Sequence, residues 1–99
     1  MKIEGAFPPV TTPFDDNGCI VHDHLAENIK RWNDTGISGY LILGSNSESV
    51  FLNEEEKLEV VKTARKSIPT SKKMLVGTGL ESTNGTLEFT RKAADHGAD

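Results

Sequence analysis

The chain has 99 residues, enough for one domain with a modest core, and its hydrophobic and charged fractions of 35% and 26% are ordinary for a globular protein. Its formal net charge of -4 argues against nucleic acid or an anionic membrane as a partner, and no apolar run approaches the roughly 20 residues of a membrane helix. The N-terminus has neither a hydrophobic signal core nor an arginine-rich amphipathic stretch, so we expect a cytoplasmic protein.

The first apolar segment, residues 6–14, contains two adjacent prolines. Because proline disfavours a central strand, we expect only Val10-Thr11-Thr12 to form a short strand, which Pro13 ends. Asp15-Asp16-Asn17-Gly18 is then a turn signal. It lacks the ligand alternation and closing glutamate of a calcium loop, so we interpret it as a plain turn.

A helix is predicted from about Val21 to Thr35, with Gly36 as its terminator. Its buried face follows the spacing i, i+4 and i+7, which brings together Leu25, Ile29 and Trp32.

The second predicted strand is Tyr40-Leu41-Ile42-Leu43, and Gly44-Ser45-Asn46-Ser47-Glu48 follows it directly. An apolar run that stops at a glycine and a polar cluster indicates a buried strand whose carboxyl end opens into a loop. In parallel sheets, ligands bind beyond such carboxyl ends. This loop is therefore the candidate binding site.

The next helix has the clearest start signal, because Asn53 and Glu56 can form a capping box, and Pro69 should end it. Its predicted buried stripe is Leu58, Val61, Ala64 and Ile68. A third strand, residues 74–79, leads to a helix that Ser82 or Thr83 caps and that runs to about His96. Its predicted inward residues are Leu87, Thr90, Ala93 and Ala94.

Strands and helices therefore alternate, and Gly97-Ala98-Asp99 announces a fourth strand. Regular alternation with short connections predicts an α/β fold with a parallel sheet and right-handed crossovers. Three such units leave raw sheet edges, so we expect a piece of a longer protein that is inactive and aggregation-prone when isolated.

Four segments in order resemble the start of the dihydrodipicolinate synthase/N-acetylneuraminate lyase family: residues 9–14, 44–48, 77–83 and 97–99. That family comprises lysine-dependent class I aldolases built on a (β/α)8 barrel. The resemblance implies that residues 1–99 are the N-terminal part of a single TIM-barrel domain and supply its first three βα units. The tetramers of the family also imply a homo-oligomer, and the resemblance implies no metal or organic cofactor.

The resemblance assigns roles to the loop after the second strand. Ser45 would pass protons along a tyrosine relay and, with Asn46, bind the carboxylate of a small 2-oxo acid. From its place in the chain, Thr12 could hydrogen-bond to the loop or have a purely structural role, and Glu48 could tie the loop to the barrel or to a neighbouring subunit. On the residues alone, the side chains of Ser45 and Asn46 could equally satisfy the loop's own backbone. Ser47 replaces a glycine usual in the family, so it is strained if its φ is positive and unstrained if the loop is ordinary there.

The nucleophilic lysine of this chemistry must be desolvated at the catalytic end of a strand, and no lysine of this chain has such a place. In the family, that lysine lies on the sixth strand and the catalytic tyrosine on the fifth, both beyond Asp99. The Ser45-Asn46 pair is most similar to the 4-hydroxy-2-oxoglutarate aldolase branch, which forms pyruvate and glyoxylate. The alternatives are a dihydrodipicolinate synthase, which condenses pyruvate with aspartate semialdehyde, and a non-catalytic barrel that binds a 2-oxo acid.

Two motifs point to other functions. His22-Asp23-His24 is similar to the His-x-His motif of metal-dependent hydrolase barrels, but it falls about ten residues after Thr12, at the opening of a helix. Gly77-x-Gly79 is typical of dinucleotide-binding turns, but Ser82 stands where the third glycine belongs. We expect exposed surface residues in the first case and a strand-end turn in the second.

Overall fold

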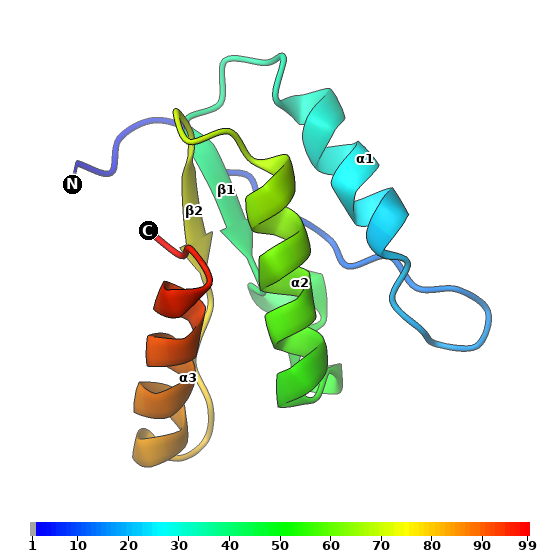
Figure 1. Ribbon diagram of the computed structural model, residues 1–99, viewed down its shortest axis with the longest axis vertical. Helices are drawn as coiled ribbons and strands as arrows, with labels where there is room; N and C mark the ends of the chain where they lie inside the picture. Colours follow the sequence, from blue (N-terminus) through cyan, green and yellow to red (C-terminus); the bar gives the residue numbers. More distant parts are fainter. Residues whose placement is uncertain (1) are drawn as a thin grey trace.

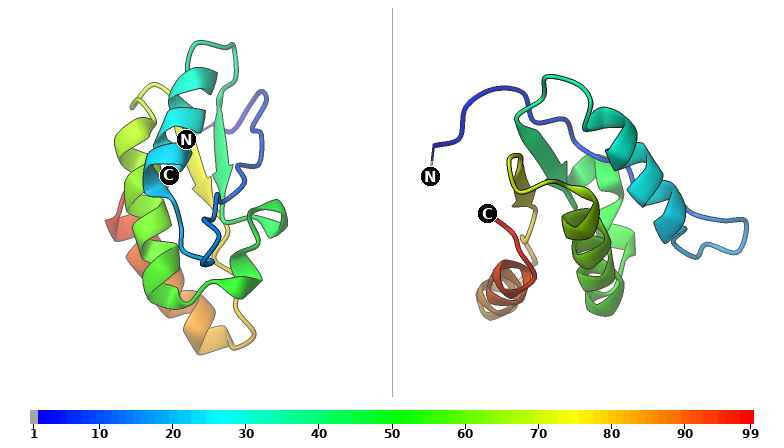
Figure 2. Two further views of the ribbon diagram at one scale, coloured as in Figure 1. Left: turned by 90° about the vertical axis from the view of Figure 1, so that its right-hand side faces the viewer. Right: turned by 45° about the horizontal axis from the view of Figure 1, so that its top comes forward.

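The computed structural model describes residues 2–99, which form three helices and a two-stranded parallel sheet, and helices and strands alternate as predicted from the first helix onward (Figure 1). Two single-turn 3-10 helices, η1 and η2, follow the first strand. Figure 2 shows that the three helices lie on one side of the sheet. In chain order the elements are α1 (His22–Trp32), β1 (Gly39–Ile42), η1 (Ser45–Ser47), η2 (Ser49–Phe51), α2 (Glu54–Ser67), β2 (Lys73–Val76) and α3 (Thr83–Asp95).

The N-terminal segment runs parallel to β1 but pairs earlier than predicted. The Leu41 N–H donates to Pro8 O at 3.0 Å, and the Val10 N–H donates to Leu41 O at 2.9 Å. The expected strand at residues 10–12 is wrong, because the pairing reduces to one bridge between Pro9 and Leu41. The adjacent prolines have no N–H to donate, so a longer ladder cannot form there.

Helix α1 ends at Trp32, and Gly36 does not cap it. The cap residue is Asn33, whose side-chain oxygen accepts the Tyr40 hydroxyl at 2.6 Å and whose amide nitrogen donates to Ser67 O at 2.8 Å. Asn33 thus joins α1, β1 and α2, and this tertiary contact fixes the helix end. Burial raises the pKa of Tyr40, so its hydroxyl stays a neutral donor.

The core lies between the helices and the sheet. The capping box of α2 is confirmed by reciprocal bonds between Asn53 and Glu56. The predicted inward face of α3 is right only for Ala93: Ala93 is buried together with Phe89, whereas Leu87 is 51% exposed. Thr90 and Ala94 are exposed as well. The buried apolar residues are Val10, Leu25, Ile29, Tyr40, Ile42, Leu43, Leu52, Val60, Val61, Ala64, Ile68, Met74, Phe89 and Ala93.

At the amino end of β2, Asp99 and Met74 hold each other by two bonds. The Asp99 N–H donates to Met74 O at 2.8 Å, and the Met74 N–H donates to the Asp99 carboxylate at 2.9 Å. Arg65 also donates to this carboxylate, at 3.1 Å. The hydrogen bond from Met74 and then the nearby Arg65 guanidinium hold the pKa of Asp99 below its ordinary 3.8.

Candidate functional site

The polar loops after β1 and β2 begin side by side at the carboxyl end of the sheet. The parallel register pairs Ile42 with Val76, so both strands end at the same level. The Gly77 N–H then donates to Ile42 O at 2.8 Å and carries the pairing one step further. Polar groups in these loops therefore gather beyond the carboxyl ends of the strands, where parallel sheets bind ligands.

Ser45 and Asn46 are exposed on η1, immediately beyond the carboxyl end of β1. Backbone bonds hold the turn, from Ser47 N to Gly44 O at 2.9 Å and from Glu48 N to Ser45 O at 3.2 Å. Within residues 2–99, the side chains of Ser45 and Asn46 make no hydrogen bond. Their polar atoms are not used to satisfy the loop's own backbone, so they remain available to a ligand.

Ser47 points the other way. Its side chain is buried, with the residue 1% exposed, and its hydroxyl donates to the carbonyl oxygen of Val10. Ser47 lies within the 3-10 turn, and the positive φ angles of non-glycine residues in residues 2–99 fall on Leu43 (59°) and Glu48 (57°). The ordinary-loop alternative therefore holds, and Ser47 carries no backbone strain.

Leu43, at the start of this loop, is a strained position. A left-handed leucine costs about 1–2 kcal/mol, and such a residue persists only where its surroundings impose it. Leu43 is buried, and a Cβ added to Gly77 would overlap its carbonyl oxygen. Gly77 is thus needed for close packing of the two strand ends, whereas Gly79 has open space around it. This packing role accounts for the first glycine of the Gly-x-Gly motif without a dinucleotide.

Thr12 and Glu48 differ from each other in burial. Thr12 is buried at 5% exposure, and within residues 2–99 its hydroxyl makes no bond to the loop, a link that Ser47 supplies instead. Glu48 is exposed, and its carboxylate forms no ion pair in the described part of the chain. Its backbone closes η1 and opens η2.

The loop after β2 uses its polar groups internally. The Thr90 hydroxyl donates to the Thr78 hydroxyl at 2.8 Å, and the Thr86 hydroxyl accepts the Leu80 N–H at 2.9 Å. The Ser82 hydroxyl accepts the Gly85 N–H at 3.0 Å and caps α3. These hydroxyls fasten the loop to the helix.

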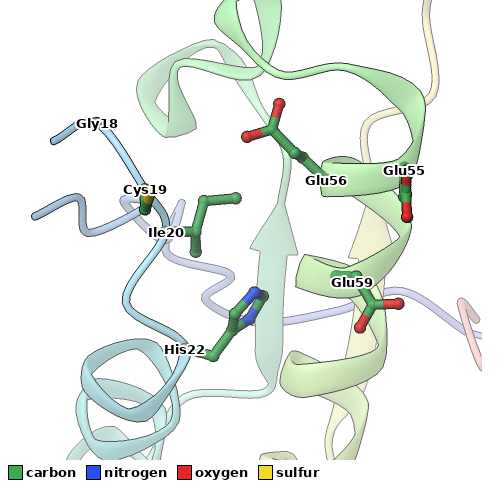
Figure 3. Close-up of a pocket in the computed structure, with 7 residues that line it drawn as sticks. All are labelled: Gly18, Cys19, Ile20, His22, Glu55, Glu56 and Glu59. Atoms are coloured by element: carbon green, nitrogen blue, oxygen red, sulfur yellow. The ribbon is translucent and has the colours of Figure 1, made fainter.

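A separate hollow of about 270 Å³ lies between the start of α1 and α2 (Figure 3). The His22 ring is hydrogen-bonded to the Thr63 hydroxyl at 2.8 Å, Glu56 belongs to the capping box, and Glu59 pairs with Lys62 at 3.2 Å. Glu55 points away from the His22 ring. Residues 2–99 contain no group of three or more acidic, histidine or cysteine side chains that could hold a metal, so the His-x-His motif gains no support.

Across residues 2–99, every helix is too short or too polar to cross a bilayer.

Residues 2–99 match the sequence model of the Dihydrodipicolinate synthetase family. The 4-hydroxy-tetrahydrodipicolinate synthase of Methanothrix thermoacetophila is 39% identical over 97 residues, which are 96% of this chain and 32% of that protein. The crystal structure of dihydrodipicolinate synthase from Aquifex aeolicus superposes with a TM-score of 0.92 at 30% identity, over 98% of this chain and 33% of that one. A prophage protein of the dihydrodipicolinic acid synthase family from E. coli K12, in complex with pyruvate, superposes with a TM-score of 0.89 at 30% identity, over 96% and 32%.

The chain thus spans about a third of the length of the relatives that it matches. The superpositions confirm the predicted fold class, an α/β chain that makes up the first three βα units of a TIM barrel. By its sequence, its fold and its strand-end loops, the chain belongs to the dihydrodipicolinate synthetase family.

Proposed function

We propose that the full-length protein is a Schiff-base (class I) aldolase or lyase that acts on a small 2-oxo acid, with residues 1–99 as the N-terminal part of its single TIM-barrel domain. The observation that carries the proposal is the pair Ser45 and Asn46, exposed and unengaged beyond the carboxyl end of β1. The pyruvate complex of the E. coli K12 family member supports a 2-oxo acid as the ligand class.

In this proposal the loop provides one half of the chemistry. The Asn46 amide and backbone N–H groups of η1 donate to the substrate carboxylate, without adding a cation that would alter the pKa of the nucleophilic lysine. The Ser45 hydroxyl contacts the same carboxylate and passes protons to and from a tyrosine. The lysine amine attacks the ketone carbon and water leaves, which gives the imine. Lysine and tyrosine are expected beyond Asp99.

The first choice of substrate is 4-hydroxy-2-oxoglutarate, cleaved to pyruvate and glyoxylate, and it rests on the Ser45-Asn46 pair. The second candidate is condensation of pyruvate with aspartate semialdehyde, favoured by the name of the Methanothrix thermoacetophila relative, 4-hydroxy-tetrahydrodipicolinate synthase. A cytoplasmic homotetramer without a cofactor completes the proposal.

Borohydride trapping tests the chemistry directly. The full-length protein is incubated with pyruvate, reduced and analysed by mass spectrometry, and we expect one reduced pyruvyl adduct per chain on a lysine. Pyruvate binding without an adduct would favour the non-catalytic barrel. If the protein neither binds pyruvate nor forms an adduct, both the aldolase and the non-catalytic barrel are excluded. Glyoxylate release from 4-hydroxy-2-oxoglutarate, set against pyruvate consumption with aspartate semialdehyde, then separates the two substrates.

A further inference from the structure

Ser47 is the buried member of an otherwise exposed polar run. Its neighbours on η1, Ser45 and Asn46, are exposed, whereas Ser47 is 1% exposed and its hydroxyl donates to Val10 O. A buried hydroxyl that has found a backbone carbonyl is costly to remove, because the carbonyl loses its partner away from water. The side chain therefore acts as an anchor from the loop into the protein.

The anchor reaches a fixed point of the sheet. Val10 lies in the N-terminal segment, and its N–H donates to Leu41 O on β1 at 2.9 Å. The loop that leaves β1 is thus fastened to the segment beside β1 on the edge away from β2. Gly77 packs against Leu43 on the other side, so the loop is held from both neighbours.

Apart from the anchor and the packing of Gly77 against Leu43, η1 is held by few bonds of its own. Its own bonds are the i to i+3 contacts of a single 3-10 turn, which have poorer geometry than those of an α-helix. The turn ends at the left-handed Glu48, and the left-handed Leu43 lies two residues before its start, so their strain favours relaxation once a constraint is lost. Any such movement displaces Ser45 and Asn46, because they belong to the same turn.

We infer that Ser47 is a positioning residue. Through its hydrogen bond to Val10, it holds Ser45 and Asn46 where they can bind the carboxylate of the 2-oxo acid. This inference rests on the proposed function. It predicts that the Ser47 hydroxyl controls substrate affinity more than it controls the lysine chemistry, because its action reaches the substrate through the carboxylate contacts.

The test compares two serine-to-alanine variants in the full-length protein. Ser47→Ala and Ser67→Ala each remove a buried hydroxyl that donates to a backbone carbonyl, but Ser67 bonds to Thr63 O within α2, at 3.1 Å. We expect Ser47→Ala to raise the pyruvate concentration for half-maximal borohydride trapping about tenfold, the effect of one lost hydrogen bond. Ser67→Ala should leave it unchanged.

Acetone separates positioning from general damage, because it forms the imine but has no carboxylate. Ser47→Ala should raise the pyruvate concentration for half-saturation and leave the acetone concentration for half-saturation unchanged. Ser47→Cys, which nearly keeps the volume and a weak donor, should give an intermediate shift and covers the case in which alanine prevents folding. Unchanged half-saturation by pyruvate in both variants, or an equal loss with acetone, would overturn the inference alone. Failure of the unaltered protein to form any adduct would overturn the proposed function, and the inference with it.

Discussion

The loops after β1 and β2 are built from similar residues but use them differently. In the β2 loop, Thr78 and the Leu80 N–H are bonded to hydroxyls of α3. In the β1 loop, Ser45 and Asn46 are unengaged within residues 2–99, and Leu43 and Glu48 near the two ends of their turn have positive φ angles. Unengaged polar side chains and stored backbone strain occur together in one loop and not in its neighbour. This coincidence is what we expect if the β1 loop binds a ligand and the β2 loop only connects the strand to α3.

Removing the Ser45 hydroxyl should give the largest effect. Ser45→Ala in the full-length protein is expected to lower kcat for the aldol reaction by about a hundredfold, because a proton relay loses a member. Steady-state kinetics measure it, with Thr78→Val as the matched change in the β2 loop, where the hydroxyl is already bonded to Thr90. Equal losses in the two variants would abolish the distinction between the loops.

Gly77→Ala should come next, because it strikes the contact between the loops. The new methyl group would overlap the Leu43 carbonyl oxygen, and overpacking of this kind costs about 1–3 kcal/mol. Urea unfolding of the full-length protein measures the loss. Gly79→Ala is the control, since nothing lies within 4 Å of its added Cβ. A Gly77→Ala protein as stable as Gly79→Ala would show that the strand ends are not closely packed.

Asn46→Ala is expected to raise KM for the 2-oxo acid about tenfold with a smaller change in kcat, because a hydrogen bond to the carboxylate is lost. Asn46→Asp keeps the shape but places a negative charge beside the carboxylate, so its KM should rise further. The ratio of the KM values of the Asn46→Asp and Asn46→Ala variants shows whether residue 46 lies beside a bound anion. If KM stays constant in both, Asn46 does not contact the carboxylate.

The smallest effect should come from the opposite end of β2, as a pH dependence. The folded-state pKa of Asp99 lies below its unfolded value of 3.8, so its stabilising contribution is present above pH 3.8 and is lost as the pH falls through the folded pKa. Unfolding midpoints of the unaltered protein and of Asp99→Asn should differ at pH 7 and converge below that window. Convergence already at pH 6, or a changed KM, would argue that this end is not independent of the loops.

The elements themselves were largely predictable, because local signals decide them. Asn53 and Glu56 announce the start of α2 by capping chemistry alone. The inward face of α3 was predicted only in part, because the buried stripe of Phe89 and Ala93 lies next to the exposed stripe of Leu87, Thr90 and Ala94. Helical periodicity cannot decide which of two adjacent stripes packs on α2 and the sheet.

The candidate site was predictable in part. Small polar residues beyond a buried strand point to Ser45 and Asn46, and this is visible in the sequence. The left-handed Leu43 leaves no sequence signal, because leucine disfavours that conformation and only packing imposes it. Ser47 shows its separate role only when Val10, 37 positions away, is seen to accept its hydroxyl.

The contact between Asp99 and Met74 has a consequence for how the chain folds. The main chain and side chain of Asp99 bond to the N–H and the carbonyl oxygen of Met74, and Arg65 donates to the same Asp99 carboxylate. A slip of one residue would break all three bonds and turn every following side chain to the opposite face. Parallel pairing is slow because its partners are distant in sequence. Asp99 therefore favours a single register of its segment against β2.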